Sequence, residues 1–326
     1  MTGTGGPVGL GEFGLIDRLL RPLAAGFPGA LGLADDAALV RVPAGAELVV
    51  AKDAIVAGVH FLSDDPPELV AGKLLRVNLS DLAAMGAEPL GYLTALARPP
   101  RLDDAWFARF AAGLASDQAR FGLHLLGGDT VSTPGPLLLS LTILGTVPEG
   151  QALRRSGARP GDHVWVSGTL GDAAIGLRAL KGLALPDEDA IPLVDRYRTP
   201  RPRLELGRAL RGLATAAIDV SDGLLADLAH IAETSGVAAV VDADALPLSE
   251  VARGVPGARD AALAGGDDYE LLFAAPAEAG DRVEALAREL GLRLTRVGRV
   301  EAGSGVRALD SEGREVRVRR SGWSHF

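Results

Sequence analysis

Apolar positions recur at helical spacing along several parts of the chain. Residues 12–21 match a short amphipathic helix, and residues 67–84 have the same spacing. Residues 103–121 are a clearer case, because their apolar side chains gather on one face of a helix. Those side chains are Trp106, Phe107, Phe110, Ala111 and Leu114. In the second half, helices are predicted at residues 171–181, 202–212, 222–235 and 281–290.

Uninterrupted apolar runs predict strands between these helices. They cover residues 47–52, 91–97 and 137–147 in the first half, and residues 163–168, 214–218, 237–242 and 269–274 in the second. Strands and helices mix without a strict alternation, which favours α+β domains over a doubly wound sheet. The turn cluster Pro148-Glu149-Gly150 predicts a boundary between two domains, at residues 1–150 and 151–326.

The composition excludes several classes of protein. The 326 residues suit two domains of roughly 150 residues each. The chain has no cysteine, and no two of its five histidines have the spacing of an H-x-x-x-H zinc pair, so a zinc enzyme is not expected. Its net charge is −9, and its one dense arginine segment, Arg317 to Arg320, is short, so nucleic acid is not an expected partner.

The sequence also lacks the patterns that direct a chain into or across a membrane. No apolar run reaches the roughly 18 residues of a membrane span, and the first residues have no basic and apolar signal segments. We therefore expect a soluble cytoplasmic protein without a membrane partner.

Aspartates recur at turn-like positions beside apolar runs. They are Asp35, Asp36, Asp53, Asp81, Asp129, Asp219, Asp222, Asp267 and Asp268. Oxygen ligands without histidine or cysteine favour magnesium, manganese or calcium. Each aspartate taken alone has the simpler interpretation of a cap or a turn residue. The similar tetrapeptides at 78–81 and 219–222 leave the same choice open, because Ser80 and Ser221 suit the start of a helix.

Two further segments suit phosphate. Gly127 and Gly128 let the backbone approach an anion closely, although a hairpin turn explains them equally well. Arg154 and Arg155 offer guanidinium groups beside a turn. The chain contains no P-loop motif.

Nine segments of the chain together resemble the thiamine-monophosphate kinase family, in order and at plausible spacing. They are GEFGLIDRL (11–19), GLADDAALV (32–40), AGVHF (57–61), NLSDLAAMGAEP (78–89), GGDT (127–130), RRSGARPGD (154–162), IDVSDGLLADL (218–228), GGDDYEL (265–271) and the terminal GWSHF. NLSDLAAMGA and the D-x-S-D-G-L pattern also occur in the wider superfamily that includes aminoimidazole ribonucleotide synthetase. AGVHF and GWSHF point more narrowly to the kinases.

The resemblance implies an enzyme that phosphorylates thiamine monophosphate to thiamine diphosphate, with ATP as co-substrate and several Mg²⁺ ions. It implies two α+β domains: an N-terminal domain that binds ATP and metal and pairs its sheet in a homodimer, and a C-terminal α/β sandwich that completes the substrate and metal site. By matching motif positions, the metal ligands would be Asp36, Asp53, Asp81, Asp129, Asp219 and Asp222. ATP would contact Gly128, Asp129, Arg155 and Ser221, and the substrate would lie near His60, Asp267 and Trp323.

The implied chemistry needs no catalytic base. A phosphate acceptor is largely ionised at neutral pH, so the obstacle is the repulsion between two anions, which magnesium held by aspartates relieves. Two alternatives remain open: another ATP-using synthetase of the superfamily, or an inactive nucleotide-binding homologue. The absence of cysteine argues against the selenophosphate synthetases and the hydrogenase maturation proteins among these.

The chain departs from the family pattern at three positions. Ala34 replaces a glycine, and Asp267 replaces a glutamate that is one methylene longer. Lys52 is the largest departure, because the family usually has a hydroxyl residue just before the metal-binding aspartate. Two interpretations remain open: the ammonium group takes over part of the charge neutralisation that a metal supplies in relatives, or the side chain points outward and only the Lys52 backbone carbonyl contacts the metal.

Overall fold

The protein is described by a computed structural model that covers residue 10, residues 14–318 and residue 322. Its contacts divide the chain into two compact units. The first comprises Met1–Asn78 and Pro89–Thr146, and the second comprises Leu79–Glu88 and Val147–Phe326. Helix α3 (Pro67–Ala84) therefore contributes residues to both units.

The first unit is built on a four-stranded sheet with the order β1-β4-β2-β3. Its strands are β1 (Ala46–Val56), β2 (Glu88–Arg98), β3 (His124–Ser132) and β4 (Leu138–Pro148). Its other helical elements are η1 (Ile16–Leu20), α2 (Arg21–Ala24), η2 (Pro28–Leu33) and α4 (Asp104–Phe121). The parallel strands β2 and β3 are joined by α4, which begins where Asp103 accepts a hydrogen bond from the Trp106 N–H and ends at the left-handed Gly122.

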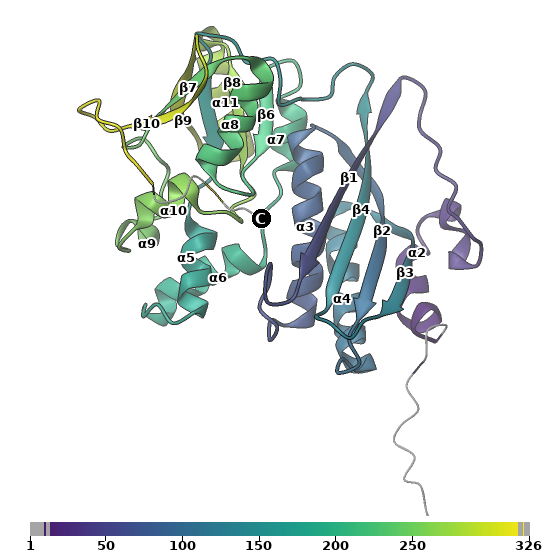
Figure 1. Ribbon diagram of the computed structural model, residues 1–326. Helices are drawn as coiled ribbons and strands as arrows, with labels where there is room; N and C mark the ends of the chain where they lie inside the picture. Colours follow the sequence, from purple (N-terminus) through teal and green to yellow (C-terminus); the bar gives the residue numbers. More distant parts are fainter. Residues whose placement is uncertain (1–9, 11–13, 319–321, 323–326) are drawn as a thin grey trace, which may run out of the picture. The chain divides into compact units, whose positions relative to one another are not determined.

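The two faces of this sheet differ. Figure 1 shows α3 and α4 on the same side of the sheet. Because side chains alternate along a strand, Val49 and Ile55 of β1 are buried on one face, whereas Leu48 and Val50 are 41% and 57% exposed on the other. The first unit therefore has an open sheet face that carries apolar side chains.

The second unit contains a six-stranded mixed sheet with the order β10-β7-β9-β5-β8-β6. Its strands are β5 (His163–Ser167), β6 (Ala216–Asp219), β7 (Ala238–Asp242), β8 (Leu271–Ala275), β9 (Leu294–Glu301) and β10 (Gly305–Leu309). Its helices are α5 (Asp172–Leu180), α6 (Asp187–Arg198), α7 (Leu204–Ala209), α8 (Leu224–Ser235), α9 (Glu250–Arg253), α10 (Ala258–Ala264), η3 (Ala277–Ala279) and α11 (Gly280–Leu290).

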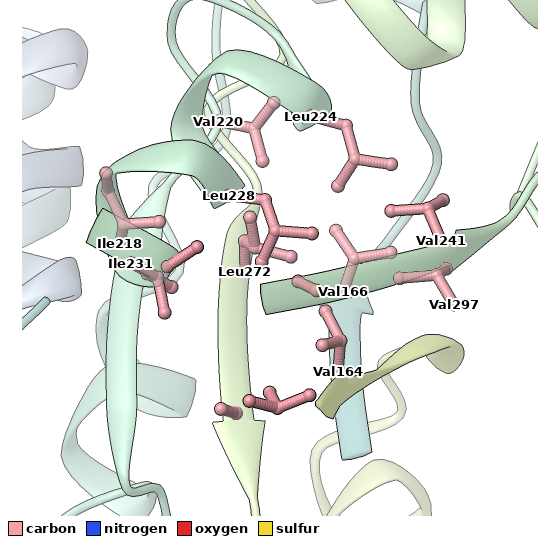
Figure 2. Packing of buried hydrophobic residues seen from close by; sticks show 14 of the residues in the cluster. Val164, Val166, Ile218, Val220, Leu224, Leu228, Ile231, Val241, Leu272 and Val297 are labelled. Atoms are coloured by element: carbon pink, nitrogen blue, oxygen red, sulfur yellow. The ribbon is translucent and has the colours of Figure 1, made fainter. Parts of the chain in front are cut away.

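Helix α8 covers one face of this second sheet. Figure 2 shows Leu224, Leu228 and Ile231 of α8 beside strand side chains such as Val166 and Leu272, and all five are at most 2% exposed. Burying a side chain of this kind contributes about 1.5–3 kcal/mol. The packing fixes α8, and with it the loop that joins β6 to α8.

The fold confirms the prediction of two α+β domains, and most predicted elements are present. Among the α-helices and strands, the prediction missed α6, α9, α10, β3, β9 and β10. The glycine segment at 127–130 lies inside strand β3, so the hairpin interpretation is wrong. The capping interpretation of Ser80 is also wrong, because Ser80 lies inside α3. In the described part of the chain, no helix has both the length and the apolar character needed to cross a membrane.

Candidate functional site

A pocket of about 190 Å³ lies in the first unit. Its polar lining comes from the segment after η2 and from strands β2 and β3: Asp35, Asp36, Thr94, Gly127, Gly128, Asp129 and Thr130. Its remaining lining is apolar and includes Leu20, Leu33 and Leu125. The structure thus brings the predicted site residue Asp36 together with Gly128 and Asp129, which lie some 90 positions later in the sequence.

Gly128 is required by close backbone approach. It pairs with Thr94 in the parallel ladder, and a β-carbon at position 128 would lie 2.3 Å from the Thr94 carbonyl oxygen. Any side chain at position 128 would push β3 away from β2 and so change the wall of the pocket. Sequence reasoning missed Thr94, and only its pairing with Gly128 reveals it as a lining residue.

Asp53 and His60 lie outside the lining of that pocket, along and after β1. The Asp53 N–H donates to the Asn78 side-chain oxygen at 3.0 Å, and Asn78, which is fully buried, donates in turn to the Leu74 carbonyl. The His60 ring accepts at Nδ1 from the Val56 N–H, so its neutral form carries the proton on Nε2. Asp53 is therefore held through its backbone by the Asn78 side chain, and the His60 ring is held by the Val56 backbone.

In the second unit, Asp219 ends strand β6 and is 4% exposed. Its carboxylate accepts a hydrogen bond of 2.7 Å from the Ser80 hydroxyl, which α3 presents. Asp81, the next residue of α3, is half-buried. The bond thus joins, within the second unit, one residue of each of the two similar tetrapeptides of the sequence.

The loop after β6 is organised by Asp227, which sequence reasoning missed. Its carboxylate accepts from the backbone N–H groups of Ser221, Asp222 and Gly223, at 3.0–3.2 Å. Burial raises the pKa of Asp227 to about 8, and the charges of Asp219 and Asp222 add to that effect. Three carboxylates therefore crowd at the start of α8. The sequence signal was an aspartate in the first turn of a helix.

Asp267 lies beside this loop. Its N–H donates to the Ser221 carbonyl at 2.9 Å, and the Tyr269 N–H donates to the Val220 carbonyl at 2.8 Å. Strand β8 then continues the pairing, with Leu271 opposite Asp219. Four predicted site residues, Asp219, Ser221, Asp222 and Asp267, thus come from two adjacent segments of one sheet edge.

Arg155 lies in an exposed segment beside β6, where the Ala217 N–H donates to the Arg154 carbonyl. The hydroxyl of Ser235, at the end of α8, donates to the Arg155 carbonyl and accepts from the N–H of Ala158. Trp323 lies outside the described residues. Gly322 is described, and a β-carbon there would lie 2.9 Å from the Asp222 carbonyl oxygen.

The oxygen donors of both units fit a hard divalent cation. Besides burial, the charges of Asp219 and Asp222 raise the pKa of Asp227, and a bound cation would relieve this repulsion. Within the described residues, no three histidine, aspartate or glutamate side chains form a ready-made metal-binding group. The carboxylates assigned to metal are divided between the units, with Asp36, Asp53 and Asp129 in the first and Asp81, Asp219 and Asp222 in the second. Their role as metal ligands stays a prediction.

Comparison with known protein families matches both halves of the chain. Residues 34–147 match the family described as AIR synthase related protein, N-terminal domain, and residues 159–311 match its C-terminal domain. The thiamine-monophosphate kinase of Caulobacter vibrioides is 47% identical over 96% of this chain and 90% of its own length.

Solved structures agree with the sequence comparison. The crystal structure of thiamine-monophosphate kinase from Stenotrophomonas maltophilia K279a superposes with a TM-score of 0.84 at 46% identity, covering 94% of this chain and 98% of that one. A structure described as AaThiL complexed with AMPPCP and TMP has a TM-score of 0.78 at 32% identity, covering 97% of each chain.

Proposed function

The chain belongs to the thiamine-monophosphate kinase family, and from that premise we propose that it transfers the terminal phosphoryl group of ATP directly to the phosphate of thiamine monophosphate. The observation that carries the activity is the identity of 47% with a thiamine-monophosphate kinase over 96% of the chain. The relative bound to AMPPCP and TMP supports the same pair of substrates. The protein is thus a phosphotransferase whose acceptor is itself a phosphate.

The two units supply different groups to this reaction. In the first unit, Gly128 and Asp129 line the pocket, and we assign both to contact with the nucleotide. In the second unit, Ser221 and Arg155 offer hydroxyl and guanidinium donors to ATP, and Asp267 lies on the neighbouring segment to orient the substrate. We assign His60 and Trp323 to the substrate by their motif positions.

We propose magnesium as the metal, held by Asp36, Asp53 and Asp129 in the first unit and by Asp81, Asp219 and Asp222 in the second. When bound, the metal neutralises the charge of the two phosphates and orients them for in-line transfer. The chain supports this assignment with carboxylate oxygens alone, the donors that magnesium prefers. The Ser80 hydroxyl and the Asn78 amide orient two of these segments, at Asp219 and Asp53.

We further propose a cytoplasmic homodimer that pairs through the open sheet face of the first unit. Leu48, Val50 and Leu138 are 38–57% exposed there, and a second copy would cover them. We assign the domain roles by the boundary in the sequence: residues 1–150 bind ATP and metal and pair the subunits, and residues 151–326 complete the substrate site. Within this division, Leu79–Glu88 belong to the second compact unit.

A turnover assay with ATP and thiamine monophosphate, followed by analysis of the phosphate products, tests the proposal. Thiamine diphosphate and ADP in equal amounts are expected. ATP cleavage that yields free phosphate would favour another synthetase of the superfamily, and nucleotide binding without turnover would favour an inactive homologue.

A further inference from the structure

The turn that carries Asp267 has an unusual backbone. Asp267 and Tyr269 have φ angles of +70° and +49°, in the left-handed region that residues other than glycine rarely adopt. Among the described residues, Leu31 and Leu33 are the other two non-glycine cases. Such conformations persist only where the surrounding structure enforces them, and they cluster at functional sites.

The peptide group between the two left-handed residues is held by one buried arginine. Arg196, on α6, uses its Nη2 atom to donate to the Asp268 carbonyl at 3.0 Å and to the Glu270 carboxylate at 2.7 Å. The Asp268 carboxylate accepts from the N–H of Gly171 at 2.7 Å, at the start of α5. The turn is therefore held by Arg196 and by the Gly171 N–H. Both groups are buried, so they do not themselves contact the substrate.

Glu270 anchors Arg196 and is fully buried. Its carboxylate also accepts from Arg203 Nε at 2.6 Å and from the Ser167 hydroxyl. The space for this carboxylate depends on Gly168, where a β-carbon would lie 2.3 Å from Glu270 Oε1. Gly168 thus leaves room for the Glu270 carboxylate, which binds the guanidinium groups of both Arg196 and Arg203.

This arrangement is a poor way to gain stability. Two guanidinium groups share the one carboxylate of Glu270, so this carboxylate does not neutralise both of them. Arg196 Nε and Nη1 are buried and have no hydrogen-bond partner in the described part of the chain. Apolar side chains of similar volume often stabilise such a site as well or better. What Arg196 does that an apolar side chain cannot is fix the orientation of the Asp268 carbonyl.

We infer that Arg196, anchored by Glu270, is a positioning residue that holds the strained 267–269 turn so that Asp267 faces thiamine monophosphate. The inference rests on the proposed function, since it takes Asp267 as a substrate-binding residue. Arg196 acts through the backbone, because its contacts are with the Asp268 carbonyl and Glu270.

Steady-state kinetics of Arg196→Met test the inference. The KM for thiamine monophosphate is expected to rise about tenfold or more, since a small misplacement of a binding group has effects of this size, while the KM for ATP changes by less than about twofold. A double-mutant cycle with Asp267→Ala gives the second readout. If Arg196 acts through Asp267, the KM of the double variant for thiamine monophosphate is no higher than that of the single variant with the higher KM.

Matched variants separate positioning from loss of stability. Arg76→Met breaks a different largely buried ion pair, the bidentate pair with Asp117, and is expected to leave both KM values unchanged. Glu270→Gln keeps the shape and weakens the anchor, and it replaces Arg196→Met in the cycle if that variant does not fold, as judged by circular dichroism. It should reproduce the selective rise in KM.

The outcomes distinguish this inference from the proposed function. If the wild-type protein does not phosphorylate thiamine monophosphate, the proposed function fails. If the wild type is active but Arg196→Met or Glu270→Gln keeps the wild-type KM for thiamine monophosphate, only the positioning role is overturned. The same conclusion follows if the increases in KM caused by Arg196→Met and Asp267→Ala multiply in the double variant. An Asp267→Ala variant with normal KM overturns it as well.

Discussion

The Lys52 ammonium group donates a hydrogen bond of 2.9 Å to the hydroxyl of Ser140, across the β1–β4 ladder. A second, longer bond of 3.4 Å reaches Thr142 on the same strand. Asp53, the next residue, points to the opposite face because side chains alternate along a strand. Lys52 therefore lies on the open sheet face, which favours the second interpretation given above, that it points outward.

Removal of the Lys52 charge is expected to leave catalysis intact. Both Lys52→Met and Lys52→Thr should keep turnover and the magnesium titration within about twofold of wild type, because the Lys52 side chain lies on the sheet face opposite the Asp53 side chain. The lost hydrogen bonds should cost about 1 kcal/mol of stability. Magnesium titrations of initial rate provide the measurement. A loss of activity in Lys52→Met would revive the first interpretation, in which the ammonium neutralises phosphate.

Neutralising a metal-directed carboxylate should reduce turnover severely. Asp53→Asn, Asp81→Asn and Asp222→Asn are each expected to lower kcat on the order of 100-fold, because each removes a charge aimed at magnesium and no core contact. Far-ultraviolet circular dichroism should stay unchanged. Near-normal turnover in all three variants would contradict the metal-site assignment.

Chelation of divalent ions should abolish activity without unfolding the protein. The proposed sites hold catalytic ions, and the core of each unit is apolar, so EDTA should leave the melting temperature of the ligand-free protein within a few degrees. Adding excess magnesium or manganese should restore turnover. Full activity in EDTA would refute the requirement for a divalent ion.

The stability of the second unit should depend on pH through Asp268. Burial raises the pKa of Asp268 to about 8, although the hydrogen bond from Gly171 and the charge of Arg196 oppose this shift. An unfolded aspartate titrates near pH 3.9, so between about pH 4 and 8 the folded state binds the extra proton. The contribution of Asp268 to the free energy of unfolding is therefore fully present below pH 4 and is lost as the pH rises through 8.

Asp268→Asn removes that proton uptake. The free energy of unfolding should then fall less steeply between pH 5 and 8, by up to about 1.4 kcal/mol per pH unit. Urea unfolding at several pH values measures the slope, and Asp281→Asn, at an exposed position of α11, serves as the control. An unchanged slope in Asp268→Asn would show that this carboxyl group does not titrate in that range.

Pairing through the open sheet face predicts a mutation that separates the subunits. Light scattering at micromolar concentration should give twice the chain mass for the wild type. Val50→Glu, on the open face, should give one chain mass, because a charge buried against an apolar partner is costly. Ile191→Glu, at a 67% exposed position of α6, should stay dimeric. A wild-type monomer would contradict the proposed homodimer.

The sequence by itself determined most of the secondary structure. Helix α3 was predicted with its observed bounds, and α4 within one residue, because apolar side chains at helical spacing over 18 residues are a local signal. The predictions failed at β3, where two glycines look like a turn in sequence. Their place in the sheet depends on the close approach of Thr94, which no local pattern encodes.

The sequence also determined which residue types serve the chemistry, since carboxylates without cysteine or paired histidines indicate a hard divalent cation. Only the tertiary structure decided how they are held. Arg196 holds the 267–269 turn through buried hydrogen bonds to the Asp268 carbonyl and to Glu270, residues more than 70 positions away. Asp227 holds the loop after β6 through backbone N–H groups four to six positions before it. Alone in the sequence they are ordinary charged residues. Their role depends on burial, because a charged group removed from water is costly unless other groups of the folded protein pair with it.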